Sequence, residues 1–135
     1  MEIPQGNSRE DIKTRRQIIK AFYDNWMSEH PERRVWNKTL KANINIKYAS
    51  VNEILGHAPR SVEATSAQMN LTEILSNAVF IEERPPKYND KNQKQFSRML
   101  FLKWKQSRVI IGKRKTTGEY ELYYISGGQK NKAVR

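Results

Sequence analysis

The chain has 135 residues, the length of one domain, and it contains no cysteine, which excludes disulfides, thiolate metal sites and cysteine nucleophiles. Its mean hydropathy is negative, no apolar run approaches the roughly 20 residues of a membrane-spanning helix, and the first residues lack the basic and apolar regions of a signal peptide, so we expect a cytoplasmic protein without a membrane partner. Lysine and arginine total 25 against 14 acidic residues, a net charge of +11, which favours a polyanionic partner.

The first predicted element is a helix over residues 9–28. Ser8-Arg9-Glu10-Asp11 forms a capping box in which Ser8 can accept a hydrogen bond from the backbone N–H of Asp11. The helix is expected to end before Pro31, and a polar connection follows over residues 30–36. The apolar residues of the helix recur at helical spacing and predict a buried stripe made of Ile12, Ile18, Ile19, Phe22, Tyr23 and Trp26.

A half-buried strand and three short helices are expected next. Residues 42–48 alternate between apolar and polar, with Ile44, Ile46 and Tyr48 on one side. Ser50 begins a second capping box and therefore a second helix. The three short helices are predicted over residues 50–56, 61–68 and 70–78.

The C-terminal third of the chain is typical of an antiparallel meander. Residues 79–83 are expected to be extended, and residues 86–95 have no apolar periodicity and should form a mobile loop. Gly118, which can adopt a positive φ, supplies the turn of the last hairpin. The remaining strands are predicted over residues 96–105, 108–114 and 120–126.

Together these elements predict an α+β fold. The N-terminal helices are expected to pack on one face of a four-stranded, mainly antiparallel sheet whose other face stays open. Residues 1–35 form the lead-in and first helix, residues 36–127 form the α+β core, and residues 128–135 form a basic flexible tail, all within one domain.

Positive charge is concentrated in the second part of the chain. Residues 1–80 carry 11 basic and 9 acidic residues, whereas residues 81–135 carry 14 basic and 5 acidic residues. Nucleic acid is the commonest anion that neutralises such a segment. The alternatives are a membrane surface or an acidic protein, and a solvated surface with no specific anion. Each aromatic residue here also fits a core or cross-strand role. The candidate nucleic-acid contacts are Arg60, Lys103, Trp104, Lys105, Arg108, Lys113, Lys115 and Tyr123.

The sequence indicates neither a metal site nor a cofactor. It has two histidines, no glycine-rich phosphate loop and no carboxylate pair suited to a metal ion. RNA can nevertheless be cleaved without a metal, because its own 2′-OH is the nucleophile and the protein need only supply proton transfer and a cation. His57 is the candidate proton shuttle, since an imidazole titrates near pH about 6.5. It also fits a simpler role at the C-terminal end of its helix, where the dipole favours a cation.

Several short motifs resemble a known family. After the histidine-bearing helix come Asn70-Leu-Thr-Glu-Ile-Leu-Ser-Asn-Ala-Val-Phe-Ile81, Val109-Ile-Ile-Gly-Lys-Arg114 and Gly118-Glu-Tyr-Glu-Leu-Tyr-Tyr-Ile125. Over about residues 40–126 the chain resembles the small domains of phage and mobile-element polyvalent proteins that are grouped with the barnase–EndoU–colicin–RelE nuclease superfamily. The resemblance implies a metal-independent ribonuclease whose site lies between the short helix and the sheet.

Within that resemblance, His57 matches the helix histidine, and Arg114, Tyr124 and Ser126 lie where hairpin residues act on phosphate. The chain departs from the family because no second histidine lies on the predicted sheet. If cleavage needs two titrating groups, lysine, tyrosine or serine must replace one of them. Three hypotheses therefore stay open: a metal-independent ribonuclease that acts on RNA, a non-catalytic DNA- or RNA-binding module, and an accessory domain that binds an acidic protein.

Overall fold

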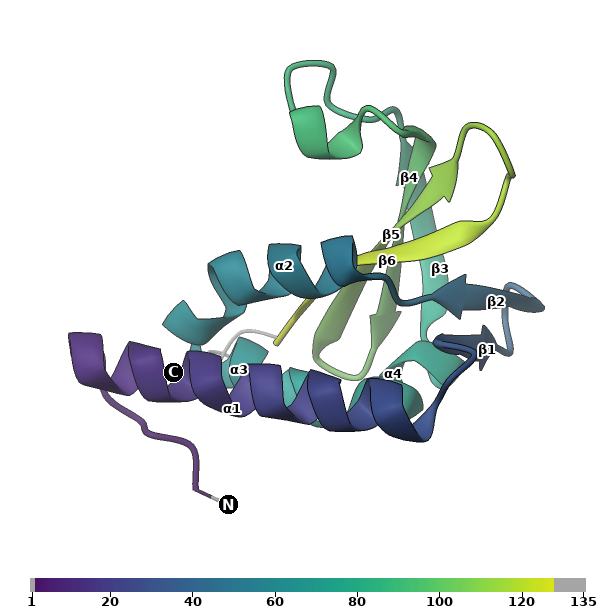
Figure 1. Cartoon of the computed structure of the whole chain (residues 1–135). Coiled ribbons are helices and arrows are strands. Elements are labelled where there is room, and N and C mark those ends of the chain that lie inside the picture. Colours follow the sequence, from purple (N-terminus) through teal and green to yellow (C-terminus); the bar gives the residue numbers. More distant parts are fainter. Residues whose placement is uncertain (1, 128–135) are drawn as a thin grey trace.

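The computed structural model describes residues 2–127, and Figure 1 shows its elements in chain order. Helix α1 spans Arg9–Glu29 and confirms the predicted start, because Ser8 Oγ accepts from the Asp11 N–H at 3.0 Å. In this part of the chain no helix is long and apolar enough to cross a membrane. The expected flexible tail, residues 128–135, lies outside the described residues.

Three further α-helices and a 3₁₀ turn precede the long strands. Ser50, expected to open the second helix, lies inside its first turn, where its Oγ accepts from the Lys47 N–H at 3.1 Å. Tyr48 consequently belongs to this helix and not to a strand, and its ring is exposed. The elements are α2 (Tyr48–His57), η1 (Ala58–Arg60), α3 (Val62–Gln68) and α4 (Leu71–Asn77).

Six strands form one mixed sheet, so the prediction of a four-stranded, mainly antiparallel sheet is wrong, although the α+β class is confirmed. The strand order is β1-β2-β6-β5-β4-β3. β2 and β6 run parallel, with Ile44 opposite Tyr120, and the other neighbours pair antiparallel. The strands are β1 (Arg34–Asn37), β2 (Ala42–Asn45), β3 (Val79–Arg84), β4 (Phe96–Trp104), β5 (Ser107–Arg114) and β6 (Tyr120–Ser126).

The strands at the two edges of the sheet, β1 and β3, explain part of the difference between the four predicted strands and the six observed. β1 lies in the segment that was expected to be a polar connection, and a polar side chain holds it in place. Asn37 is fully buried, and its Nδ2 donates to the carbonyls of Leu75 and Ala78 at 2.7 and 2.9 Å. β3 is exposed at all six positions, as an edge strand can be. Buried and exposed positions do alternate in β1, but one of its two buried positions holds Asn37 and the exposed Trp36 is apolar, whereas β3 shows no alternation of burial. Neither strand therefore shows the apolar-and-polar alternation by which a strand is recognised in a sequence.

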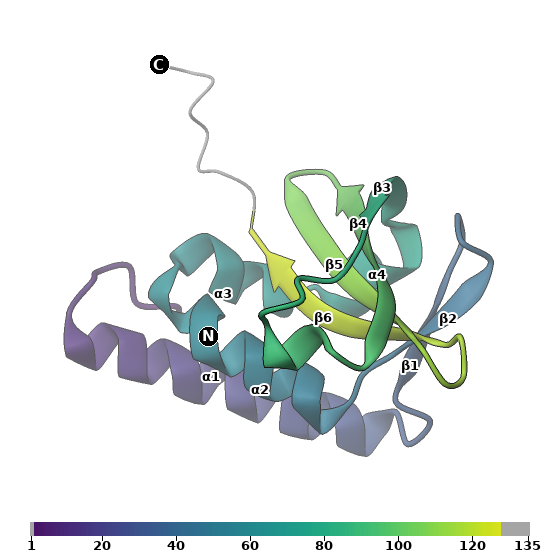
Figure 2. The same ribbon diagram turned by 90° about the horizontal axis from the view of Figure 1, so that it is seen from above.

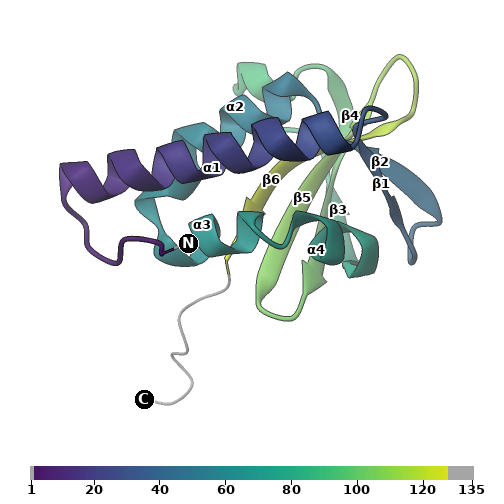
Figure 3. The same ribbon diagram turned by 60° about the horizontal axis from the view of Figure 1, so that its bottom comes forward.

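The helices do not form a single layer over one face of the sheet, which corrects the second half of the predicted architecture. α2 and α3 pack on β6, and α4 packs on β1. α1 packs mainly on α2, α3 and η1, and Figure 3, in which the bottom of the molecule comes forward, shows it in front of them. The buried core joins this helical assembly to one set of strand residues, among them Leu100, Leu102, Val109 and Ile111.

A bulge in β6 changes which side chains face that core. Ile110 lies opposite Tyr124 and Ile111 opposite Leu122, so Tyr123 is the extra residue on the β6 side. Strict alternation would have put Leu122 and Tyr124 on the same face. With the bulge, Leu122 enters the core while Tyr124 lies beside Ile110 on the opposite face, and both Tyr123 and Tyr124 border the same surface hollow.

Residues 86–95, expected to be a mobile loop, instead contain a second 3₁₀ turn, η2 (Lys91–Gln93), which stands above α2 in Figure 1. Hydrogen bonds tie this segment to its neighbours. Asn92 Nδ2 donates to Glu53 Oε1 on α2 at 3.3 Å, and the Tyr123 hydroxyl on β6 donates to Asp90 Oδ2 at 3.3 Å. Figure 2 shows α2 alongside β6, with the η2 segment above them. This arrangement frames the surface described next.

Candidate nucleic-acid groove

Four surface hollows lie next to one another along α2 and across the sheet, because each shares two lining residues with the next. We call the whole surface the α2–β6 groove and its parts the Arg114 hollow, the η2 hollow, the His57 hollow and the Lys103 hollow. The residues shared by successive hollows are Ala49 and Glu121, then Glu53 and Tyr123, then Arg84 and Phe101.

The His57 hollow has a volume of about 490 Å³ and lies between α2, the η2 segment and strands β4 to β6. His57 Nε2 is 3.3 Å from Glu53 Oε2, one helical turn earlier on α2. The imidazole meets the Tyr124 ring edge-on, with the ring centroids 6.0 Å apart. The His57 side chain is 60% exposed and that of Glu53 only 16% exposed, so the carboxylate is shielded while the imidazole is accessible to a ligand.

Both tyrosines of this hollow hold their protons tightly. Burial, and then the negative charge of Glu53, raises the pKa of Tyr124. Burial raises the pKa of Tyr123 to about 12, and the Glu53 and Asp90 carboxylates act in the same direction. At neutral pH these hydroxyls are therefore hydrogen-bond donors and not bases. Within residues 2–127, no group of three or more His, Cys, Asp or Glu side chains is placed to hold a metal ion.

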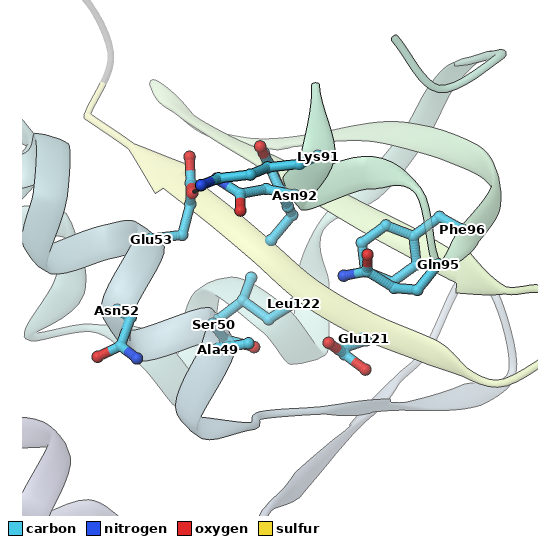
Figure 4. A pocket seen from close by; sticks show the side chains of 11 residues that line it. Ala49, Ser50, Asn52, Glu53, Lys91, Asn92, Gln95, Phe96, Glu121 and Leu122 are labelled. Atoms are coloured by element: carbon cyan, nitrogen blue, oxygen red, sulfur yellow. Dashed lines mark hydrogen bonds between the residues drawn. The ribbon is translucent and has the colours of Figure 1, made fainter. Parts of the chain in front are cut away.

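The η2 hollow, about 320 Å³, continues the groove on the other side of Glu53 (Figure 4). Asn92 donates to Glu53, and Figure 4 shows the Lys91 side chain directed toward the same carboxylate. Asn52 and Gln95 add amide groups to its lining. Glu53 is thus the shared wall of the two hollows, and its carboxylate faces Lys91 and Asn92 on one side and the His57 imidazole on the other.

The structure brings five of the predicted site residues onto one face of the sheet. Tyr124 and Ser126 are two residues apart on β6, about 7 Å along the strand, and side chains at this spacing share a face. Arg108 lies opposite Ser126, and Lys103 lies opposite Arg108. Lys103 and Arg108 line the Lys103 hollow, which adjoins the His57 hollow through Arg84 and Phe101. His57 completes this set from α2, and Tyr123 lines the same hollow.

Arg114 lies in the groove but at its far end, away from His57. Its Nε donates to Glu121 Oε1 at 3.0 Å, and the Glu121 side chain is only 3% exposed. The Arg114 hollow, about 600 Å³, does not include His57. The guanidinium therefore neutralises a buried carboxylate of β6, and the structure does not bring it to the imidazole as the predicted shared site requires.

The two lysines of the β5–β6 hairpin also lie apart from His57. Lys113 and Lys115 are exposed and line none of the four hollows. The Lys115 N–H donates to the Gln95 carbonyl, which places this residue where the hairpin meets the η2 segment. Both are surface cations near the turn at Gly118, whose φ is +73° as the turn prediction requires.

Trp104 faces away from the groove. Its ring packs against the core, and its Nε1 donates to Glu73 Oε2 on α4 at 3.2 Å. Lys105 covers the same ring, with Nζ 5.5 Å from the centroid and 3.6 Å from the Glu73 carboxylate. The expectation that Trp104 and Lys105 belong to one nucleic-acid surface with His57 is therefore not supported.

Three groove residues escaped the sequence analysis. Glu53 is the last residue of the capping box that begins at Ser50, and its i,i+4 spacing to His57 was the available signal. Arg84 and Lys87 flank the Pro85-Pro86 break, and both line the His57 hollow. Arg84 pairs with Glu82 at 2.6 Å and lies 4.6 Å from the Phe101 ring centroid. Nothing local in the sequence distinguishes these two cations from the others.

Comparison with known proteins identifies the kind of domain. The chain matches the family model described as large polyvalent protein-associated domain 3 over residues 10–119. The chain therefore belongs to the large polyvalent protein-associated domain 3 family, which confirms the expected association with polyvalent proteins. Neither the curated proteins nor the solved structures give a significant match. Membership of the nuclease superfamily stays a prediction.

Proposed function

We propose that this domain binds nucleic acid in the α2–β6 groove and cleaves RNA there without a metal ion, as part of a phage or mobile-element polyvalent protein that acts in the cytoplasm. The observation that carries the proposal is the His57 hollow, where an accessible imidazole paired with a shielded carboxylate adjoins a protonated tyrosine. Two cations line the same hollow, Arg84 at the end of β3 and Lys87 in the β3–β4 connection.

The proposed proton transfer uses the nitrogen of His57 that lies away from Glu53. Glu53 Oε2 is 3.3 Å from Nε2, which favours a proton on Nε2 and leaves Nδ1 to take a proton from a ligand. In the proposed reaction Nδ1 takes the proton of the RNA 2′-OH while the 2′-oxygen bonds to phosphorus. The bond from phosphorus to the 5′-oxygen breaks, and that oxygen takes a proton from water. The hydroxide left behind takes the proton from Nδ1, which restores water and the neutral imidazole. The products are a 2′,3′-cyclic phosphate and a 5′-hydroxyl.

The phosphate charge would be met by donors that surround the imidazole. The Tyr124 hydroxyl, protonated at neutral pH, can donate to a non-bridging oxygen. Lys87 forms no ion pair within residues 2–127 and is available as a cation. Lys103 and Arg108 line the adjoining hollow, where they would meet the next phosphate of the bound RNA strand.

The test compares wild type with His57→Ala and with His30→Asn, using single-stranded RNA in EDTA. His30 is the matched control because its ring stacks on Trp26, with centroids 4.2 Å apart, outside the groove. General acid–base catalysis contributes about 10²–10⁴ in rate. We expect His57→Ala to lower cleavage at least 100-fold while RNA affinity stays within about threefold. His30→Asn should leave both unchanged after correction for folded fraction.

The substrate controls are DNA of the same sequence and RNA with 2′-O-methyl groups, which should bind and stay intact because neither offers a 2′-OH. Absence of both salt-sensitive RNA binding and EDTA-resistant cleavage in the wild type would refute the proposal. Binding to an acidic protein that persists at high salt and after nuclease treatment would instead assign the groove to protein recognition.

One observation favours a non-catalytic nucleic-acid module as the second candidate. Both tyrosines of the His57 hollow have raised pKa values, so neither readily exchanges a proton near neutral pH. A single imidazole would then have to serve the whole reaction. The same experiment separates the two functions, because a module of this kind binds RNA and DNA in EDTA, leaves both intact, and keeps its affinity in His57→Ala.

A further inference from the structure

A second cationic surface lies beside His57 on the other side of α2. The pocket between α1 and η1 has a volume of about 270 Å³, and four of its lining residues are cations: Arg9, Lys13, Arg16 and Arg60. We call it the α1–η1 pocket. No acidic residue lines it. Of these four cations only Arg60 is a predicted nucleic-acid contact, because the other three lie on a helix some 50 positions earlier in the sequence.

The cations of this pocket are not neutralised by neighbouring carboxylates. Within residues 2–127, none of the four takes part in an ion pair. Glu10 and Asp11 lie on the first turn of α1 but do not line the pocket. Unpaired cations around one hollow raise its positive potential, which attracts an anion.

Two further arginine contacts hold the pocket in shape. Arg16 Nη1 donates to the Leu55 carbonyl near the end of α2, which fixes α1 against that helix. Arg15 is fully buried, and its Nε donates to the Pro59 carbonyl at 2.6 Å, which fixes η1 against α1. No carboxylate pairs with Arg15 within the described residues, so its charge adds to the positive potential behind the pocket.

The pocket and the His57 hollow open on either side of one short segment. Gly56 lines the α1–η1 pocket, while His57, the next residue, lines its own hollow. Arg60 follows three residues later, at the end of η1. Gly56 has no Cβ, and nothing lies within 4 Å of where one would be, so the surface between the two hollows is unobstructed at this point.

We infer that the α1–η1 pocket is a backbone-phosphate subsite for the same RNA strand whose reacting phosphate lies at His57. This inference rests on the proposed function and extends the bound strand beyond the α2–β6 groove, over the C-terminal end of α2. Arg9, Lys13 and Arg60 are the phosphate contacts, because all three are exposed and none of their side chains donates to a protein group in the described chain. Arg16 chiefly positions the helices.

The experiment measures binding of a fluorescent, 2′-O-methylated 12-nucleotide RNA, which cannot be cleaved, over a range of salt concentrations. The test variant is Lys13→Gln/Arg60→Gln. The matched control is Lys38→Gln/Lys41→Gln, which removes the same charge from the β1–β2 turn at the opposite end of α1 (Figure 1). Both pairs are exposed, and the thermal stability of each variant is recorded alongside.

Two phosphate contacts to a single strand contribute about −1.4 to the slope of log affinity against log salt concentration. Relative to 1 M salt, where this contribution vanishes, they raise the affinity about 25-fold at 0.1 M salt. We expect the test variant to lose affinity and slope by about these amounts, and the control to stay within about twofold of wild type. Equal effects of the two variants, with wild type still binding, would overturn the subsite and leave the proposed function standing. A wild type that does not bind RNA would overturn both.

Discussion

Replacing Arg114 by methionine separates a structural role for this residue from the phosphate-binding role predicted for it. The Arg114 Nε donates to Glu121 Oε1 at 3.0 Å, and the Glu121 side chain is 3% exposed while that of Arg114 is 31% exposed. Methionine keeps most of the apolar length of arginine but removes the charge. The carboxylate of Glu121 then stays buried in the sheet without a counterion.

The expected cost can be worked out from this burial. Removing one partner of a buried ion pair costs about 3–5 kcal/mol, because the remaining charge is desolvated and unpaired. Arg114 is about a third exposed, so water can reach the site once it is gone, and we expect about 2–3 kcal/mol. For a chain of this length that corresponds to a fall in Tm of about 6–9 °C.

The assay is urea unfolding at pH 7 followed by circular dichroism. Arg98→Met is the matched control, since Arg98 Nε also donates to one carboxylate, Glu83 Oε2 at 2.8 Å, but both side chains are 40% or more exposed. Such a surface pair is worth about 0.5 kcal/mol. Adding Glu121→Gln to Arg114→Met should recover much of the loss. Equal destabilisation by Arg114→Met and Arg98→Met would refute the reasoning.

Two further predictions concern packing and pH. Gly112→Ala should lower the free energy of unfolding by about 1–3 kcal/mol, because the new Cβ would lie 2.5–2.6 Å from ring atoms of the buried Phe96. Gly56→Ala should raise it by about 0.5–1 kcal/mol, because the new methyl group has free space around it and alanine favours a helix over glycine. Thermal melts in which both variants shift in the same direction would contradict this pair of predictions. The raised pKa of Tyr123, about 12, means that the folded state keeps a proton that the unfolded chain loses from pH about 10 upward, so stability should fall above pH 10. Tyr123→Phe should flatten this decline in unfolding experiments between pH 9 and 12, and Tyr88→Phe, which changes a ring that is 91% exposed, should not.

Local patterns in the sequence were enough for the elements that local chemistry controls. The α1 helix begins at its predicted cap because Ser8 and Asp11 are three residues apart and need nothing else to bond. The β5–β6 turn sits at Gly118 because that backbone requires a positive φ. The three long strands of the C-terminal half appear close to where their apolar residues placed them.

The errors occur where distant residues decide the structure. β1 is held by Asn37, whose partners Leu75 and Ala78 are some 40 residues away. The parallel pairing of β2 with β6 joins Ile44 to Tyr120, and no hydropathy pattern encodes such a partner. The η2 segment lacks apolar periodicity because hydrogen bonds, not apolar burial, attach it to α2 and β6.

In the candidate site too, some features could be predicted from the sequence and others depend on the tertiary structure. Charge and the absence of cysteine predicted a polyanionic partner from composition alone, and these properties need no fold to be visible. The family resemblance then pointed to His57 as the centre of the site, which stays a prediction. Which cations share a surface with the imidazole was decided only by the tertiary structure. Strand register places Lys103 and Arg108 on the face of Tyr124, the buried Glu121 draws Arg114 away, and helix packing brings Lys13 to Arg60. The physical reason is that charge is a property of each residue, whereas its neighbours are set by pairing and packing between segments far apart in the chain.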